Sequence, residues 1–193
     1  MHSELASHPD STRWNARYQG DFVPSFTAHP LAELALSMPL PAGPVLDLAC
    51  GPSGSALLAA AAGHRVTAVD ISDVALALLA REAARRGLAG LIELVHADLG
   101  RWRPQRPDGY AFVLATGYWD RALFAPAAAA VTGSGLLAWE AFTAEARRAR
   151  PSLSADWCLA EGEPACLLPP GFEVISQSDH ADASKRRLLA RRR

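Results

Sequence analysis

The chain has 193 residues, half of them hydrophobic and 20% charged, a composition that fits one globular domain and excludes a disordered chain. The formal net charge is −1, so no overall basic field attracts nucleic acid or an anionic membrane. Three cysteines without CxxC spacing argue against a disulfide framework or a metal site and favour the cytoplasm. No apolar run reaches the roughly 20 residues that span a bilayer.

The first third of the chain predicts a tail, two helices and a break. Residues 1–13 are polar and are expected to form a flexible tail that precedes a single domain over 14–193. Residues 14–26 mix aromatic and polar side chains, which fits a short helix and a loop. Residues 31–38 carry apolar side chains at i, i+3, i+4 and i+7 and predict an amphipathic helix, which the prolines of 39–44 end.

From residue 45 onward, apolar strands alternate with helical patterns. Strands are expected at 45–49, 65–69, 91–95, 110–115 and 135–142, and helices at 54–62, 74–86 and 126–131. Two further strands are expected at 172–176 and 186–191, and the four prolines within 143–171 predict a loop. The alternation predicts an α/β fold: a doubly wound, mostly parallel sheet with helices on both faces, and ligands at the carboxyl ends of its strands.

Three acidic residues follow three of these strands at their carboxyl ends. Asp47 lies within VLDLACGPSG (45–54), where a strand runs into a glycine turn and then a helix. Asp70 ends the next strand, at the spacing of an acid that accepts both hydroxyls of a ribose. Asp98 follows the third strand and can accept from an adenine amine. A carboxylate at Asp47 would repel a pyrophosphate but attract an ammonium group.

This set of acids suits a ligand that carries adenine, ribose and a cationic amino-acid tail but no phosphate. S-adenosylmethionine has these parts. A nicotinamide dinucleotide would require G-x-G-x-x-G, and the residues after Gly51 break that spacing at Ser53 and Ala56.

These motifs, together with VTAVDIS (66–72), HADL (96–99) and TGSGLLAWEAF (132–142), resemble the class I S-adenosylmethionine-dependent methyltransferases. The chain is most similar to the small tellurite-resistance-like members, which often begin with W-x-x-R-Y, here Trp14 to Tyr18. The resemblance covers most of residues 14–142. It implies a set of cofactor-binding residues: Arg17 and Tyr18 over the cofactor, Asp47, Ala49 and Gly51 at its methionine end, Asp70 and Ile71 at ribose and adenine, Asp98 and Leu99 at adenine, and Ala115 beneath the sulfonium.

Two residues depart from the family pattern. Ala49 replaces the commonest first glycine, and Ser53 stands where a glycine is usual, so that it either tightens the turn or weakens cofactor binding. The acceptor is expected just beyond the fourth strand, near Tyr118 and Asp120. Asp120 is the candidate general base or substrate-orienting group, with a helix N-cap as the alternative.

The expected activity is methyl transfer to a small-molecule acceptor by in-line displacement, with S-adenosylmethionine as cofactor and no metal. Nucleic acid is not an expected partner, although residues 185–193 are basic. The preferred interpretation of that segment is an edge strand at Leu188–Ala190 with solvated arginines around it. The oligomeric state stays open. The alternatives are a non-catalytic binding or scaffold protein with the same fold and, less favoured, a nicotinamide-dependent oxidoreductase.

Overall fold

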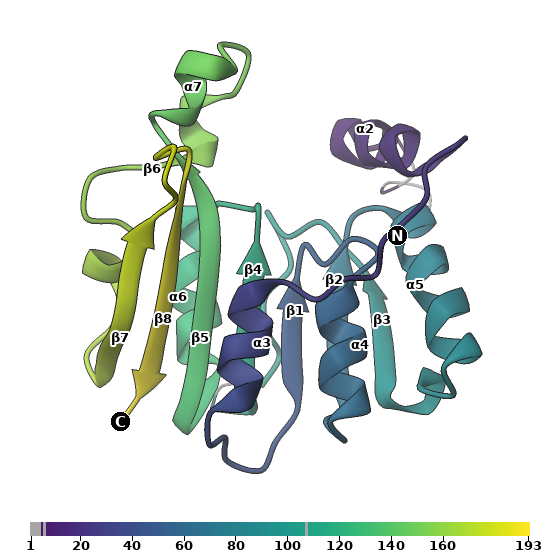
Figure 1. The fold of residues 1–193 in the computed structure, drawn as a ribbon, viewed down its shortest axis with the longest axis horizontal. Coiled ribbons are helices and arrows are strands. Elements are labelled where there is room, and N and C mark those ends of the chain that lie inside the picture. Colours follow the sequence, from purple (N-terminus) through teal and green to yellow (C-terminus); the bar gives the residue numbers. More distant parts are fainter. Residues whose placement is uncertain (1–4, 6, 107) are drawn as a thin grey trace.

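The protein is built around one mixed sheet with the strand order β3-β2-β1-β4-β5-β8-β7, in which the short strand β6 pairs with β5 (Figure 1). The computed structural model describes residues 5, 7–106 and 108–193. The strands are β1 (Val45–Leu48), β2 (Val66–Asp70), β3 (Ile92–His96), β4 (Tyr110–Thr116), β5 (Val131–Thr143), β6 (Cys158–Leu159), β7 (Phe172–Asp179) and β8 (Lys185–Arg192). The strands β3, β2, β1, β4 and β5 are parallel to their neighbours, whereas β8 is antiparallel to both β5 and β7. The prediction of a mostly parallel α/β sheet is confirmed.

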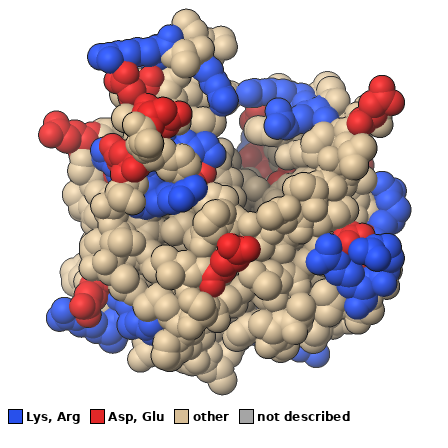
Figure 2. Space-filling model, viewed as in Figure 1, with Lys and Arg blue, Asp and Glu red and all other residues tan. Residues whose placement is uncertain are grey.

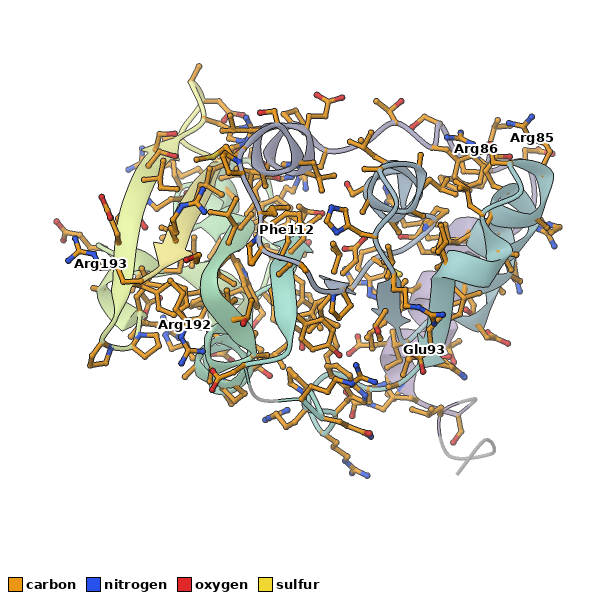
Figure 3. The ribbon with its side chains drawn as sticks, turned by 90° about the horizontal axis from the view of Figure 1, so that it is seen from below. Arg85, Arg86, Glu93, Phe112, Arg192 and Arg193 are labelled. Carbon is orange, nitrogen blue, oxygen red and sulfur yellow. The ribbon has the colours of Figure 1, made fainter. Side chains whose placement is uncertain are left out.

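Helices lie on both faces of this sheet. They are α2 (Pro9–Tyr18), α3 (Pro30–Ser37), α4 (Gly54–Ala61), α5 (Asp73–Arg85), α6 (Arg121–Ala129) and α7 (Ala146–Ala149). Helices α3, α4 and α5 cover one face, and α6 packs on the other (Figures 1 and 3). Helix α2 lies over the carboxyl ends of the strands instead, beside the start of α5.

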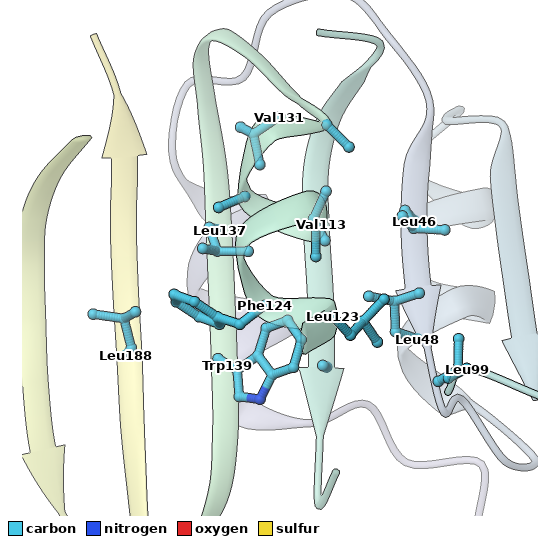
Figure 4. Close-up of a cluster of buried hydrophobic side chains, with 14 of the residues drawn as sticks. Leu46, Leu48, Leu99, Val113, Leu123, Phe124, Val131, Leu137, Trp139 and Leu188 are labelled. Atoms are coloured by element: carbon cyan, nitrogen blue, oxygen red, sulfur yellow. The ribbon is translucent and has the colours of Figure 1, made fainter. Parts of the chain in front are cut away.

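The core has two layers because apolar side chains alternate along the central strands. Phe112 and Leu114 of β4 face α3 and α4, and Figure 3 places Phe112 in the middle of the molecule. Val113 of β4 faces α6, where the rings of Phe124 and Trp139 meet edge to face with centroids 5.1 Å apart (Figure 4). Each buried ring or leucine contributes roughly 1.5–3 kcal/mol of hydrophobic stabilisation.

The ends of the chain differ from the sequence predictions. Pro9–Arg13 belong to α2 and not to a tail: His8 caps the helix, accepting from the Asp10 amide, and Pro9 suits its first turn. Residues 1–4 and 6 lie outside the described residues. Residues 185–192 form β8, which lies between β5 and β7, so the edge strand on this side of the sheet is β7 and the expectation of an edge strand at Leu188–Ala190 was wrong.

Two of the connections also differ. Helix α6 begins at Arg121 and β5 at Val131, several residues before the predicted starts. Between β3 and β4, the described residues of 97–109 contain no helix, so the face of β2 and β3 opposite α4 and α5 has thin cover. A cavity of about 490 Å³ lies there, lined by Thr67, Glu93 and Trp102 among others, near the amino ends of these strands and away from the three acids.

Candidate functional site

The turn between β1 and α4 adopts a left-handed backbone at two positions. Ala49 has φ +50° and Gly51 has φ +56°. Such a conformation costs a non-glycine residue roughly 1–2 kcal/mol, so Ala49 holds strain at this turn. A Cβ on Gly51 would lie 3.0 Å from the hydroxyl of Tyr18, so the bare backbone of Gly51 lets α2 approach the turn.

Ser53 joins the strand to the helix. Its hydroxyl donates to Asp47 Oδ2 at 2.6 Å and accepts from the amide of Ala56 at 2.9 Å, which makes Ser53 the N-cap of α4. This geometry favours the tighter turn of the two sequence alternatives. Asp47 itself is buried, and burial raises its pKa to about 7, with a contribution from the charge of Asp70, although the Ser53 hydrogen bond lowers it.

Asp70 connects the glycine turn to the end of β2. Its Oδ2 accepts from the amide of Gly51 at 2.7 Å, and its Oδ1 accepts from the amide of Ser72 at 2.8 Å. Burial raises its pKa, while these backbone amides lower it. Each carboxylate oxygen keeps a second lone pair, so Asp70 can accept further hydrogen bonds from a ligand.

The third acid follows β3. Asp98 Oδ1 accepts from the amide of Gly100 at 2.8 Å, and its Oδ2 lies 3.9 Å from Nε2 of His8. Nε2 of His96, at the end of β3, lies 3.0 Å from the carbonyl of Ile71. Because β1, β2 and β3 are adjacent and parallel, Asp47, Asp70 and Asp98 lie at one edge of the sheet.

Two of the other predicted cofactor residues lie beneath this edge. Leu99 and Ala115 are buried in the core layer that packs on α6. They support the site from below.

Helix α2 lies over the site. Tyr18 is close above Gly51, and burial followed by the charge of Asp70 raises its pKa to about 12. The guanidinium of Arg17 is 5.8 Å from the centroid of the Trp14 ring, and the charge of Arg17 offsets part of the rise in the Tyr18 pKa. Asn15 connects α2 to the start of α5. Its Oδ1 accepts from the Ser72 hydroxyl at 2.6 Å, and its Nδ2 donates to Asp73 Oδ1 at 2.7 Å.

The far wall of the site follows β4. Asp120 caps α6, since its Oδ1 accepts from the amide of Ala122 at 2.8 Å. Burial and the charge of Asp120 raise the pKa of the half-buried Tyr118 phenol. Arg121, the first residue of α6, forms a two-pronged ion pair with Glu163 at 2.7 and 2.8 Å.

Figure 2 shows a hollow between the α7 segment and α2, above the carboxyl ends of the strands. Its two walls approach each other where the guanidinium of Arg13 lies 5.0 Å from the centroid of the Trp157 ring. Three contributors were missed from the sequence. Asn15 stands inside the W-x-x-R-Y element and could have been found there, whereas Gly54 and Glu140 gave no local signal. A Cβ on Gly54 would lie 2.4 Å from the backbone of Thr27, so Gly54 lets the 22–29 loop pass against α4.

Residues 45–135 match a family described as "Methyltransferase domain". No curated protein sequence matches the chain significantly. Among solved structures, one from work on the conversion of a disulfide bond into a thioacetal group during echinomycin biosynthesis is 17% identical, with a TM-score of 0.69 over 95% of this chain and 93% of that one. Geranyl diphosphate C-methyltransferase from Streptomyces coelicolor A3(2), with Mg²⁺, geranyl diphosphate and S-adenosyl-L-homocysteine, is 13% identical, with a TM-score of 0.69 over 97% and 99% of the two chains. The glycopeptide N-methyltransferase MtfA with S-adenosylmethionine is 19% identical, with a TM-score of 0.59 over 89% and 98%.

The family match begins at β1 and includes the glycine turn and all three acids, and the whole-chain matches share the fold. Residues 45–135 therefore resemble a methyltransferase domain, and the chain has the fold of the class I S-adenosylmethionine-dependent methyltransferases.

Proposed function

We propose that the protein transfers a methyl group from S-adenosylmethionine to a small-molecule acceptor by in-line displacement. The observation that carries this proposal is the convergence of Asp47, Asp70 and Asp98 at one sheet edge, beneath Tyr18. A sulfonium cofactor supplies an already activated methyl group. The methyltransferases that share the fold act, by their names, on geranyl diphosphate and on a glycopeptide, which supports a small acceptor here.

The residues at this edge fit such a cofactor. Asp47 is a buried carboxylate whose charge needs a cationic partner, as the ammonium of an amino-acid tail would provide. Asp70 retains lone pairs for ribose hydroxyls, and Gly51 leaves its α-carbon bare. The strand order, with antiparallel β8 inserted between β5 and β7, differs from the 3-2-1-4-5-6 order of dinucleotide-binding domains, which disfavours the oxidoreductase alternative.

The chain's own contribution to catalysis is to orient the reactants and exclude water. Such orientation is worth effective molarities of about 10⁵–10⁸ M. Tyr118, whose raised pKa keeps the phenol protonated, donates a hydrogen bond that orients the acceptor. Oδ1 of Asp120 accepts the hydrogen bond that caps α6, and Oδ2 is the oxygen that takes the acceptor's proton.

Within the class, we assign the protein to the small tellurite-resistance-like group, because Trp14, Arg17 and Tyr18 of that group's N-terminal element all lie in α2 near the site. We place it in the cytoplasm, where its three cysteines would stay reduced. None of the helices in the described part of the chain has the length and hydropathy needed to cross a bilayer.

Calorimetric titration with S-adenosylmethionine, S-adenosylhomocysteine and NADH tests the proposal. We expect the first two ligands to bind and NADH not to bind. We also expect Asp70→Ala to weaken both by about tenfold or more, since hydrogen bonds to a charged group are worth roughly 1.5–3 kcal/mol. Binding of NADH alone would support the oxidoreductase, and binding of none of the three would support the scaffold protein.

A further inference from the structure

The basic strand β8 carries more positive charges than the acidic side chains that pair with them. Most of its basic side chains have separate partners: Arg186 pairs with Asp179, Arg192 with Asp108, and Arg193 beyond it with Glu173, while Arg191 donates to the carbonyls of Pro39 and Ser134. Lys185 and Arg187 differ, because they share a single carboxylate. Lys185 Nζ lies 2.6 Å from Oε1 of Glu140, and Arg187 Nε lies 2.7 Å from its Oε2.

Glu140 is buried and also contacts two histidines. Its side chain is 1% exposed, and its Oε2 is also 3.1 Å from Nε2 of His29 and 2.9 Å from Nε2 of His180. Three of its four polar contacts therefore fall on Oε2 and one, from Lys185, on Oε1. Burial raises its pKa, but the hydrogen bonds from His29, Lys185 and Arg187 outweigh burial and hold the pKa well below its ordinary value.

The two cations keep unused donors. An ammonium has three N–H groups and a guanidinium five, and Glu140 receives one bond from each. Their side chains are 30% and 34% exposed, so these donors reach solvent. In the described part of the chain, no set of three or more His, Cys, Asp or Glu side chains is arranged to hold a metal ion, so the two histidines act here as hydrogen-bonding groups.

The surroundings do not cancel the surplus charge. Arg150 lies 5.3 Å from the Phe142 ring, whose centroid is 5.4 Å from Lys185 Nζ, and it adds a third cation. Asp182 interacts electrostatically with His180 and is the second acid of this region, after Glu140. The balance is three cations against two acids before either histidine is protonated.

This basic cluster (Lys185, Arg187 and Arg150) lies near the carboxyl end of β5, the strand next to the β4 end where the acceptor is proposed to bind. Glu140 pairs in register with Thr116, the last residue of β4, and its carbonyl accepts from the amide of Gly117 at 2.8 Å. Arg187 is Glu140's partner on β8, which places it two strands from β4, roughly 10 Å away. In Figure 2, basic side chains gather to the left of the hollow, over the upper ends of β5 and β8, with acidic ones among them.

We propose that Lys185 and Arg187 bind an anionic oxygen group, a phosphate or a carboxylate, on the methyl acceptor. The inference rests on the proposed function and names the class of acceptor for that site. Glu140 holds the two cations in place and cancels one charge, and the acceptor's anion cancels the other. Charge-assisted hydrogen bonds of this kind are the strong ones, and the guanidinium fork matches the geometry of both anions.

Titration with inorganic phosphate, followed by ³¹P NMR on protein saturated with S-adenosylhomocysteine, tests the site. We expect saturable binding that Arg187→Gln weakens by about tenfold, equivalent to about 1.4 kcal/mol. Arg187→Lys should retain most of the binding. The matched control is Arg85→Gln, which removes the same charge from an exposed pair on α5 and should bind phosphate as the wild type does.

An unchanged affinity for S-adenosylhomocysteine in Arg187→Gln shows that the variant is folded and separates this test from that of the proposed function. A second arm offers acceptors in pairs, each acid beside its neutral amide or ester, and measures S-adenosylhomocysteine formation. Turnover of the acids alone supports the inference. Phosphate binding that is absent from the wild type or unaltered in Arg187→Gln, or equal turnover of the neutral partners, overturns it.

Discussion

We predict that Asp47 links cofactor binding to pH. Burial raises its pKa to about 7, and an ammonium nearby would favour the charged form, so binding must displace its proton. Calorimetry of S-adenosylhomocysteine at pH 7 in buffers of different ionisation heats should therefore show release of about half a proton per ligand. Asp47→Asn should abolish that release, and an equal release in wild type and variant would show that Asp47 does not face the ammonium.

The same residue affects stability with a defined sign. The folded-state pKa of about 7 lies above the ordinary value of 3.8, so the folded state holds a proton that the unfolded chain loses. The free energy of unfolding should then fall as the pH rises from about 4 to 7. Because Asn cannot titrate, the Tm of Asp47→Asn relative to wild type should rise across that window. A pH-independent difference in Tm would contradict the burial of a titrating carboxyl.

Asp120 combines a structural and a proposed chemical task, and one substitution separates them. Asn is as good an N-cap as Asp, so Asp120→Asn should leave the Tm of the protein unchanged. If the free oxygen takes the acceptor's proton, kcat with any acceptor found active should fall about 10²–10⁴-fold. Asp120→Ala would add the loss of the cap, about 1 kcal/mol of stability. Full activity of Asp120→Asn would leave Asp120 as a cap alone.

Among the elements, α2 is held to the rest of the fold by few polar contacts. Asn15 makes two of them, to Ser72 and Asp73, and Arg13 touches Trp157 on the opposite wall. Asn15→Ala should shift α2 toward an open position by about 1–2 kcal/mol. Amide hydrogen exchange over residues 9–18 should therefore become about tenfold faster, and S-adenosylhomocysteine should dissociate faster.

The control for that experiment is Gln19→Ala, an exposed position at the end of the same helix. It should leave both the exchange rate and the dissociation rate at wild-type values. Equal exchange in Asn15→Ala and wild type would mean that the hydrogen bonds of Asn15 to Ser72 and Asp73 do not hold α2 in place.

At the scale of the whole molecule, the parallel half of the sheet could be predicted because its strands and helices alternate with clear periodicity. The three acids were found because each follows its own strand. The position of the basic C-terminal strand within the sheet could not be predicted, because insertion of β8 between β5 and β7 depends on pairing over long sequence distances. For the same reason the contacts of Glu140 with His29, His180, Lys185 and Arg187 gave no local pattern.

The central claim is that Asp47, Asp70 and Asp98 together bind an adenosyl sulfonium compound. A crystal structure of the protein with S-adenosylhomocysteine tests it most directly. The account predicts the ribose hydroxyls at Asp70, the adenine amine at Asp98, the amino group toward Asp47 and Tyr18 over the ligand. A ligand bound elsewhere, or at this edge with none of the three carboxylates in contact, would contradict it.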